Sequence, residues 1–60
     1  MKQATITFYE NTETGECTVS DSTGTFDDYS SDSHSQAADE AESMIAHLEA
    51  EGYQVALDIR

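Results

Sequence analysis

Residues 33–59 read SHSQAADEAESMIAHLEAEGYQVALDI, in which a helix pattern is followed, after one glycine, by a strand pattern. In the first part the apolar residues recur every three or four positions and share one face about 120° wide. These residues are Ala37, Ala38, Ala41, Met44, Ile45 and Leu48. Such spacing is typical of an amphipathic helix packed on a core, so we predict a helix over residues 36–51.

Both ends of this helix carry recognisable signals. Ser33 followed by Gln36 fits a capping box at the N-terminus, and Ser35 is a second candidate for the N-cap. Gly52 suits the C′ position, where a left-handed backbone is common. The last turn holds Glu49 and Glu51 and lacks the Lys or Arg that the helix dipole would favour there. Because this placement breaks a local rule, it indicates that these carboxylates serve binding.

Alternation of apolar and polar residues predicts strands before and after the helix. Residues 4–9 and 16–21 alternate clearly, as do residues 53–59. Residues 25–29 form a weaker third candidate around Phe26. The β-β-β-α-β order predicts an α+β fold, a small antiparallel sheet with one amphipathic helix packed on one face. The predicted core consists of Ile6, Phe8, Val19, Phe26, Ile45, Leu48, Val55 and Leu57.

The length of 60 residues predicts a single domain, residues 1–60, with a thin core. A domain of this size has little interior in which to build a deep catalytic cleft. We therefore expect a protein that is not an enzyme and that works through the outside of its fold.

The charge balance is the most informative property of the composition. Thirteen Asp and Glu residues face two basic ones, Lys2 and Arg60, which gives a net charge of −11. This sign argues against nucleic acid and anionic membranes as direct ligands, because both are bound through Lys and Arg. It favours a basic partner, such as a nucleic-acid-binding protein, a cationic peptide or a metal ion. The alternative is that the acidity only keeps a small domain in solution.

The acidic residues concentrate on the predicted helix and on the segment that precedes it. Residues three or four positions apart on a helix lie about 5–6 Å from one another, a spacing similar in scale to that of DNA phosphates. The helix lacks the Lys and Arg that would pair with its acids. The predicted partner-binding residues are Asp27, Asp28, Asp32, Asp39, Glu40, Glu42, Glu49 and Glu51.

The sequence gives little support for metal binding, a cofactor or catalysis. His34 and His47 are too far apart to share adjacent turns, and we interpret both as surface histidines, so no metal site or cofactor is predicted. Cys17 is interpreted as a small core residue and not a nucleophile, since no base accompanies it. One cysteine permits no internal disulfide, and residues 1–9 lack the apolar run of a signal peptide. We therefore expect a cytoplasmic protein, and no catalytic residue is predicted.

Small size, extreme acidity and one helix on a short sheet resemble the phage-encoded inhibitors that mimic DNA, among them anti-CRISPR and anti-restriction proteins. The resemblance covers the whole chain and is one of physical character. It implies an inhibitor, acting in the cytoplasm of the host cell, that blocks the nucleic-acid-binding surface of a bacterial defence complex.

A second resemblance rests on the element order and on the helix start Asp32-Ser33-His34-Ser35-Gln36-Ala37-Ala38. Over about residues 6–51 these are similar to the HicB antitoxin family. That resemblance implies a partial RNase H-like fold that plugs a small RNase toxin. The chain has SDSTG at residues 20–24 where that family has a proline-containing loop.

A third hypothesis is a homodimer or larger homo-oligomer. Tyr9, Tyr29 and Tyr53 are candidate interface anchors. The sheet face that carries Thr5, Thr7 and Tyr9 has no evident cover in the predicted fold.

Overall fold

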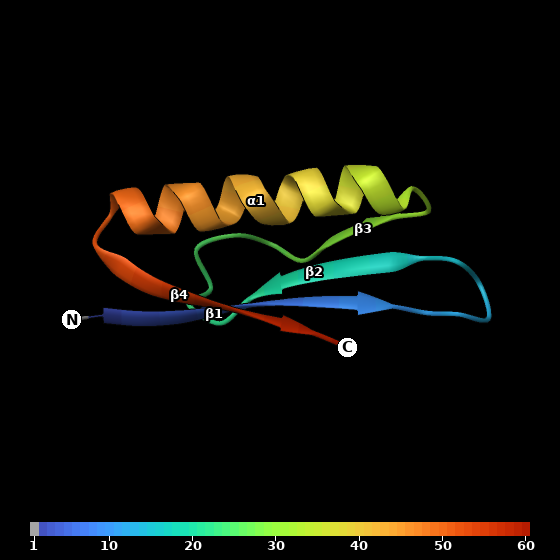
Figure 1. Cartoon of the computed structure of the whole chain (residues 1–60), viewed down its shortest axis with the longest axis horizontal. Helices are drawn as coiled ribbons and strands as arrows, with labels where there is room; N and C mark the ends of the chain where they lie inside the picture. Colours follow the sequence, from blue (N-terminus) through green and yellow to red (C-terminus); the bar gives the residue numbers. More distant parts are fainter. Residues whose placement is uncertain (1) are drawn as a thin grey trace.

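The computed structural model describes residues 2–60 of the predicted domain, with Met1 outside the described residues. It contains one four-stranded sheet and one helix, which lies across one face of the sheet (Figure 1). The elements are β1 (Lys2–Glu10), β2 (Cys17–Asp21), β3 (Tyr29–Ser31), α1 (His34–Ala50) and β4 (Tyr53–Ile59). The predicted α+β fold with a single packed helix is confirmed.

The sheet is mixed, whereas the sequence predicted an antiparallel one. Its strand order is β3-β2-β1-β4, and β1, β2 and β3 pair as antiparallel neighbours. β4 pairs with β1 in parallel, with Ala4 opposite Val55 and Phe8 opposite Ile59. The reason is that α1 carries the chain back along the sheet before β4 begins, and a strand that follows such a crossover runs parallel to the strand before it.

The core lies between α1 and the helix-facing side of β1 and β2. Its buried residues are Ala4, Ile6, Phe8, Cys17, Val19, Ala37, Ala41, Met44 and Leu48. Phe26, Ile45 and Val55 are partly buried against them, as predicted. Leu57 was predicted to be in the core, but half of it is exposed. It lies on the edge strand, opposite a stretch of α1 whose short Ala38 and Ala41 do not cover it.

The helix begins at His34, two residues before the predicted start, and it ends at Ala50. Ser33 is the N-cap, and its hydroxyl accepts a hydrogen bond from the N–H of Gln36. The return bond of the capping box runs through Ser31, whose hydroxyl accepts from the N–H of Ser33 and donates to the Gln36 amide oxygen. At the other end Gly52 adopts φ +93°, which confirms it as the C′ residue.

The third strand lies later than predicted, at Tyr29–Ser31 instead of residues 25–29. The carboxylate of Asp21 accepts hydrogen bonds from the N–H groups of Thr23, Thr25 and Phe26. Because these backbone groups bind a side chain, they do not form a strand ladder. The segment is instead a loop organised around Asp21.

Candidate functional site

Seven of the eight predicted partner-binding residues are exposed, and the eighth, Glu40, is partly buried. Asp39, Glu40, Glu42 and Glu49 project from α1, and Glu51 is its C-cap residue. Asp27 and Asp28 belong to the loop between β2 and β3, and Asp32 lies between β3 and the N-cap.

The carboxylates of α1 form two rows along opposite flanks of the helix. With 3.6 residues per turn and Ala37, Ala41, Met44 and Leu48 facing the sheet, Glu42 and Glu49 fall on one flank and Glu40 and Glu51 on the other. The outer crest carries Asp39 together with the uncharged Ser43, Ala46 and Ala50. The helix therefore presents two acidic flanks, and its outer crest is largely neutral.

The loop that carries Asp27 and Asp28 contacts α1 through Phe26, on the flank of Glu40 and Glu51, whereas nothing within the described residues ties Asp32 to this flank. Phe26 packs edge-to-face on the imidazole of His47, with ring centroids 5.2 Å apart. His47 lies on the same flank, with its Nε2 3.6 Å from the Glu51 carboxylate. Asp27 and Asp28 directly follow Phe26, so their backbone lies within two residues of this contact. We call the group Asp27, Asp28, Glu40 and Glu51 the loop flank.

Sequence reasoning missed the role of both histidines. His47 is exposed, as interpreted, but it also links the loop to the helix C-terminus. The four-residue spacing from His47 to Glu51 is the signal that could have found this contact. His34 packs edge-to-face on Phe8, with ring centroids 5.2 Å apart, and so covers one end of the core.

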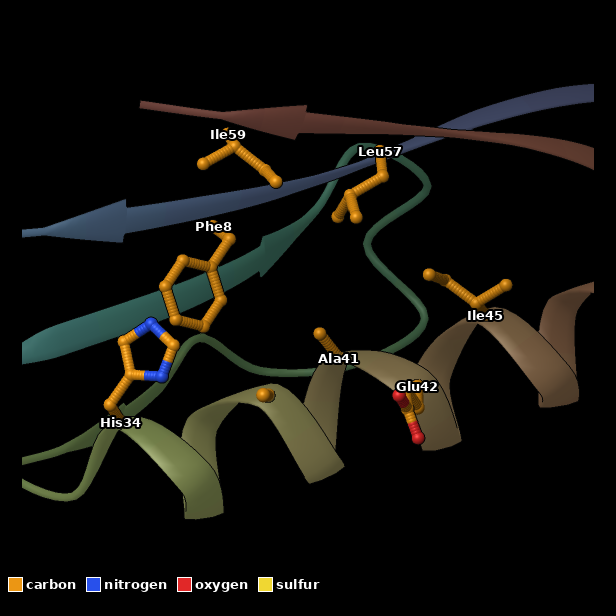
Figure 2. A pocket seen from close by; sticks show the side chains of 8 residues that line it. Phe8, His34, Ala41, Glu42, Ile45, Leu57 and Ile59 are labelled. Carbon is orange, nitrogen blue, oxygen red and sulfur yellow. The ribbon is translucent and has the colours of Figure 1, made fainter.

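An apolar groove between α1 and β4 is the second surface feature that the sequence did not indicate. Its volume is about 190 Å³ and Figure 2 shows the side chains that line it. They are Phe8, His34, Ala38, Ala41, Glu42, Ile45, Leu57 and Ile59. Glu42 is the only carboxylate among them, so the groove suits an apolar side chain better than an ion.

Cys17 and Asp21 have shifted proton affinities with structural causes. Burial, followed by the charge of Glu10 on the neighbouring strand, raises the pKa of the Cys17 thiol. The thiol thus stays protonated at neutral pH and is a poor nucleophile, in agreement with its place in the core. Partial burial works to raise the pKa of Asp21, but hydrogen bonds from Thr23, Phe26 and Thr25 outweigh it and hold this pKa below its usual value.

Within residues 2–60, no group of three or more His, Cys, Asp or Glu side chains is placed to hold a metal ion. The one helix of this part of the chain is also too short and too polar to span a bilayer. The structure therefore defines a small acidic α+β domain with two acidic helix flanks and one apolar groove. No protein-family model, curated protein or solved structure matches this chain.

Proposed function

We propose that this chain is a non-enzymatic binding protein whose acidic flanks occupy a basic, nucleic-acid-binding surface of a partner protein. The partner class is that of bacterial defence complexes, and the action is that of an anti-CRISPR-like or anti-restriction-like inhibitor in the cytoplasm of a host cell. Nucleic acid itself and lipid surfaces are not ligands in this proposal, because the acidic flanks repel both.

The proposal rests on the positions of the basic side chains. The ammonium group of Lys2 lies over the ring of Tyr53, 5.3 Å from its centroid. The Nε of Arg60 is 3.0 Å from the Asp58 carboxylate. Both contacts are at β1 and β4, so neither Lys nor Arg neutralises the acidic flanks of α1 within the described residues. The basic side chains of α1 are its two histidines, His47 beside Glu51 and His34 at the groove that Glu42 also lines, and a histidine carries charge only when protonated.

Uncompensated carboxylates on one helix repel one another and destabilise the fold. A basic partner removes this repulsion and gains charge-assisted hydrogen bonds. Because the acids are exposed and long-range attraction steers the encounter, association is fast and weakens steeply as salt is added.

The flanks also have a spacing suited to phosphate sites. Glu42 and Glu49 are seven residues apart, which corresponds to about 10.5 Å along the helix axis. That is about three phosphate steps along one DNA strand. The loop flank supplies a parallel set of charges on the other side of the helix crest.

The test compares two variants with equal charge. Glu40, Glu42 and Glu49 are replaced by Gln in one variant, and Glu10, Glu13 and Glu16 by Gln in the other. Each changes the net charge from −11 to −8. Tagged wild type and both variants capture proteins from a bacterial lysate, which are eluted with rising NaCl and identified. The captured protein is then tested for displacement of labelled duplex DNA by the chain.

The proposal requires a basic nucleic-acid-binding protein that is captured by wild type and by the β1–β2 loop variant, released by salt, and lost in the helix variant. Equal loss in both variants would show that only net charge matters and would overturn the assignment of the acidic flanks. Capture that leaves DNA binding by the partner intact would overturn the inhibitory role.

The apolar groove favours a second candidate, a HicB-like antitoxin that plugs a small RNase. An apolar side chain of the toxin fits beside Leu57 and Ile59, both on the groove wall. This candidate predicts capture of a small ribonuclease that survives high salt and the helix variant, but is lost when Ile59 is replaced by Ser. The two candidates therefore differ in both the salt step and the variant that removes binding.

A further inference from the structure

The two edges of the sheet are protected to very different degrees. At one edge β3 is three residues long, and Asp28 and Asp32 adjoin its two ends. Short edge strands and nearby charges prevent pairing with another chain. At the other edge β4 is seven residues long, and its only charged residue is Asp58. Apart from Asp58, which is paired with Arg60, this edge has none of the usual protective features within the described residues.

The open backbone groups of β4 can be assigned from its last contact with β1. The N–H of Arg60 donates to the carbonyl of Phe8, and the carbonyl of Arg60 accepts from the N–H of Glu10. Both backbone groups of Arg60 thus face β1. The direction of the N–H and C=O groups alternates from one residue of a strand to the next, so those of Asp58, Ala56 and Gln54 also point towards β1. The residues whose N–H and C=O groups face outwards are Tyr53, Val55, Leu57 and Ile59.

The same residues direct their side chains to the helix-covered side of the sheet. Leu57 lies opposite Ile6 and Ile59 lies opposite Phe8 in the parallel register, and both partners on β1 are buried. Leu57 is nevertheless 50% exposed and Ile59 is 71% exposed. Open hydrogen-bonding groups and uncovered apolar side chains therefore coincide along one strand.

We infer that a second copy of this chain pairs with β4 in an antiparallel, two-fold symmetric manner, which joins two sheets into one of eight strands. In such a pair, a residue whose N–H and C=O groups point away from β1 must lie opposite a residue whose groups also point away from β1. Among the registers that meet this condition, one overlaps all seven residues and places Ala56 on the two-fold axis. It brings Leu57 opposite Val55 of the second copy and Ile59 opposite Tyr53.

The charges on the strand favour a second copy over a basic partner. In this register Asp58 faces Gln54, so no like charges meet across the new ladder. Asp58 is already bound to Arg60, so a basic strand finds no free carboxylate along β4. The edge is a neutral strip on an acidic protein, so two copies can meet along it without close repulsion.

Two chains of net charge −11 still repel at long range, and Glu42 borders the groove next to the strip. Screening by salt therefore strengthens the dimer. This is opposite to the salt dependence of a complex between the acidic flanks and a basic partner. The inference is independent of the proposed function, and the sign of the salt effect separates the two.

The register gives a direct test by crosslinking. Ala56 and its symmetry mate form a pair that is not hydrogen-bonded to each other, for which the Cα atoms are about 4.5 Å apart, within the range that a disulfide spans. Ala56→Cys is oxidised in parallel with Ser30→Cys, which places an exposed cysteine on the opposite edge strand. Wild type serves as the background, since its Cys17 is buried. The mass of each chain is measured by sedimentation equilibrium at low and high NaCl.

We expect wild type to form a dimer that tightens with salt, Ala56→Cys to crosslink rapidly, and Ser30→Cys to remain uncrosslinked. Ile59→Lys, at a site exposed enough to leave the fold intact by circular dichroism, is expected to be monomeric. A wild type that stays monomeric at high protein and salt concentration overturns the inference. So does crosslinking of Ala56→Cys that is no faster than that of Ser30→Cys.

Discussion

The ring of Phe26 rests edge-on against the imidazole of His47, which ties the loop after β2 to the last turns of α1. Phe26 is partly buried against the core, and Asp27 and Asp28 follow it directly. One apolar contact thus sets where two of the loop-flank carboxylates lie. A substitution of Phe26 can therefore move these carboxylates without changing the net charge.

Replacement of Phe26 by Ala should weaken both the fold and binding by the loop flank. The change removes a half-buried ring, for which we expect a loss of about 2 kcal/mol in the free energy of unfolding. Partner binding should also fall at temperatures where the variant is still folded, although its net charge is unchanged. Urea unfolding and titration calorimetry measure the two effects. Phe26→Leu is the control, and equal affinity in the Ala variant and wild type would exclude a positioning role.

Asp21 should contribute to stability in a pH-dependent way. Its carboxylate accepts the N–H groups of Thr23, Thr25 and Phe26 and the hydroxyl of Thr23. Asp21→Asn retains one acceptor oxygen but loses the charge, so we expect a loss of about 1–2 kcal/mol at neutral pH. The measurement is urea unfolding of both proteins over a series of pH values.

The sign of the pH effect follows from the lowered pKa of Asp21. A group whose pKa is lower in the folded state stabilises the fold at pH values above its unfolded pKa of 3.8, and this contribution is lost as the pH falls through the folded value. The difference between wild type and Asp21→Asn should thus be constant near neutrality and shrink below about pH 4. Taking the difference removes the common effect of the other carboxylates, and a gap that widens in acid would contradict this role.

Cys17 should be unreactive until the protein unfolds. Its side chain is fully buried, and burial and Glu10 raise the pKa of its thiol. We expect alkylation by iodoacetamide to be very slow in native buffer and fast in urea, as followed by mass spectrometry. Ser30→Cys supplies an exposed thiol that should react quickly in the same tube. Rapid native alkylation of Cys17 would show that β2 opens locally.

Periodicity predicted most of the fold because it reports which side chains meet the core. The alternation in β1 and β2 and the stripe on α1 placed Ile6, Val19 and Leu48 correctly inside. Capping residues located the helix ends to within two residues. The direction of β4 was wrong, because an alternating strand has the same pattern whether its neighbour is parallel or antiparallel. Leu57 was misplaced for a related reason, since periodicity gives the face of a residue but not how far the helix covers it.

Helical periodicity also groups the acids of the helix, because 3.6 residues per turn direct Asp39 to the crest and Glu40 and Glu42 to opposite flanks. The sequence did not indicate how the loop acids lie relative to these flanks. The link from Phe26 to His47 depends on the path of a loop, which local sequence does not encode. The third strand begins later than predicted because one side chain, Asp21, binds backbone groups of Thr25 and Phe26 that would otherwise be free to pair.

The net charge of −11 should make the stability of this protein rise with salt. Carboxylates along α1 have no Lys or Arg beside them in the described structure, and the Debye length falls from about 10 Å at 0.1 M to about 3 Å at 1 M salt. Screening should therefore relieve repulsion and raise the Tm in NaCl, as measured by circular dichroism at a fixed low protein concentration. The variant with Gln at Glu40, Glu42 and Glu49 should have a higher Tm at low salt and a weaker response, because part of the repulsion is already gone. The variant with Gln at Glu10, Glu13 and Glu16 separates local from global repulsion, since its charge is the same. If both variants respond to salt as wild type does, the carboxylates of the helix do not carry the strain that binding to a basic partner is proposed to relieve.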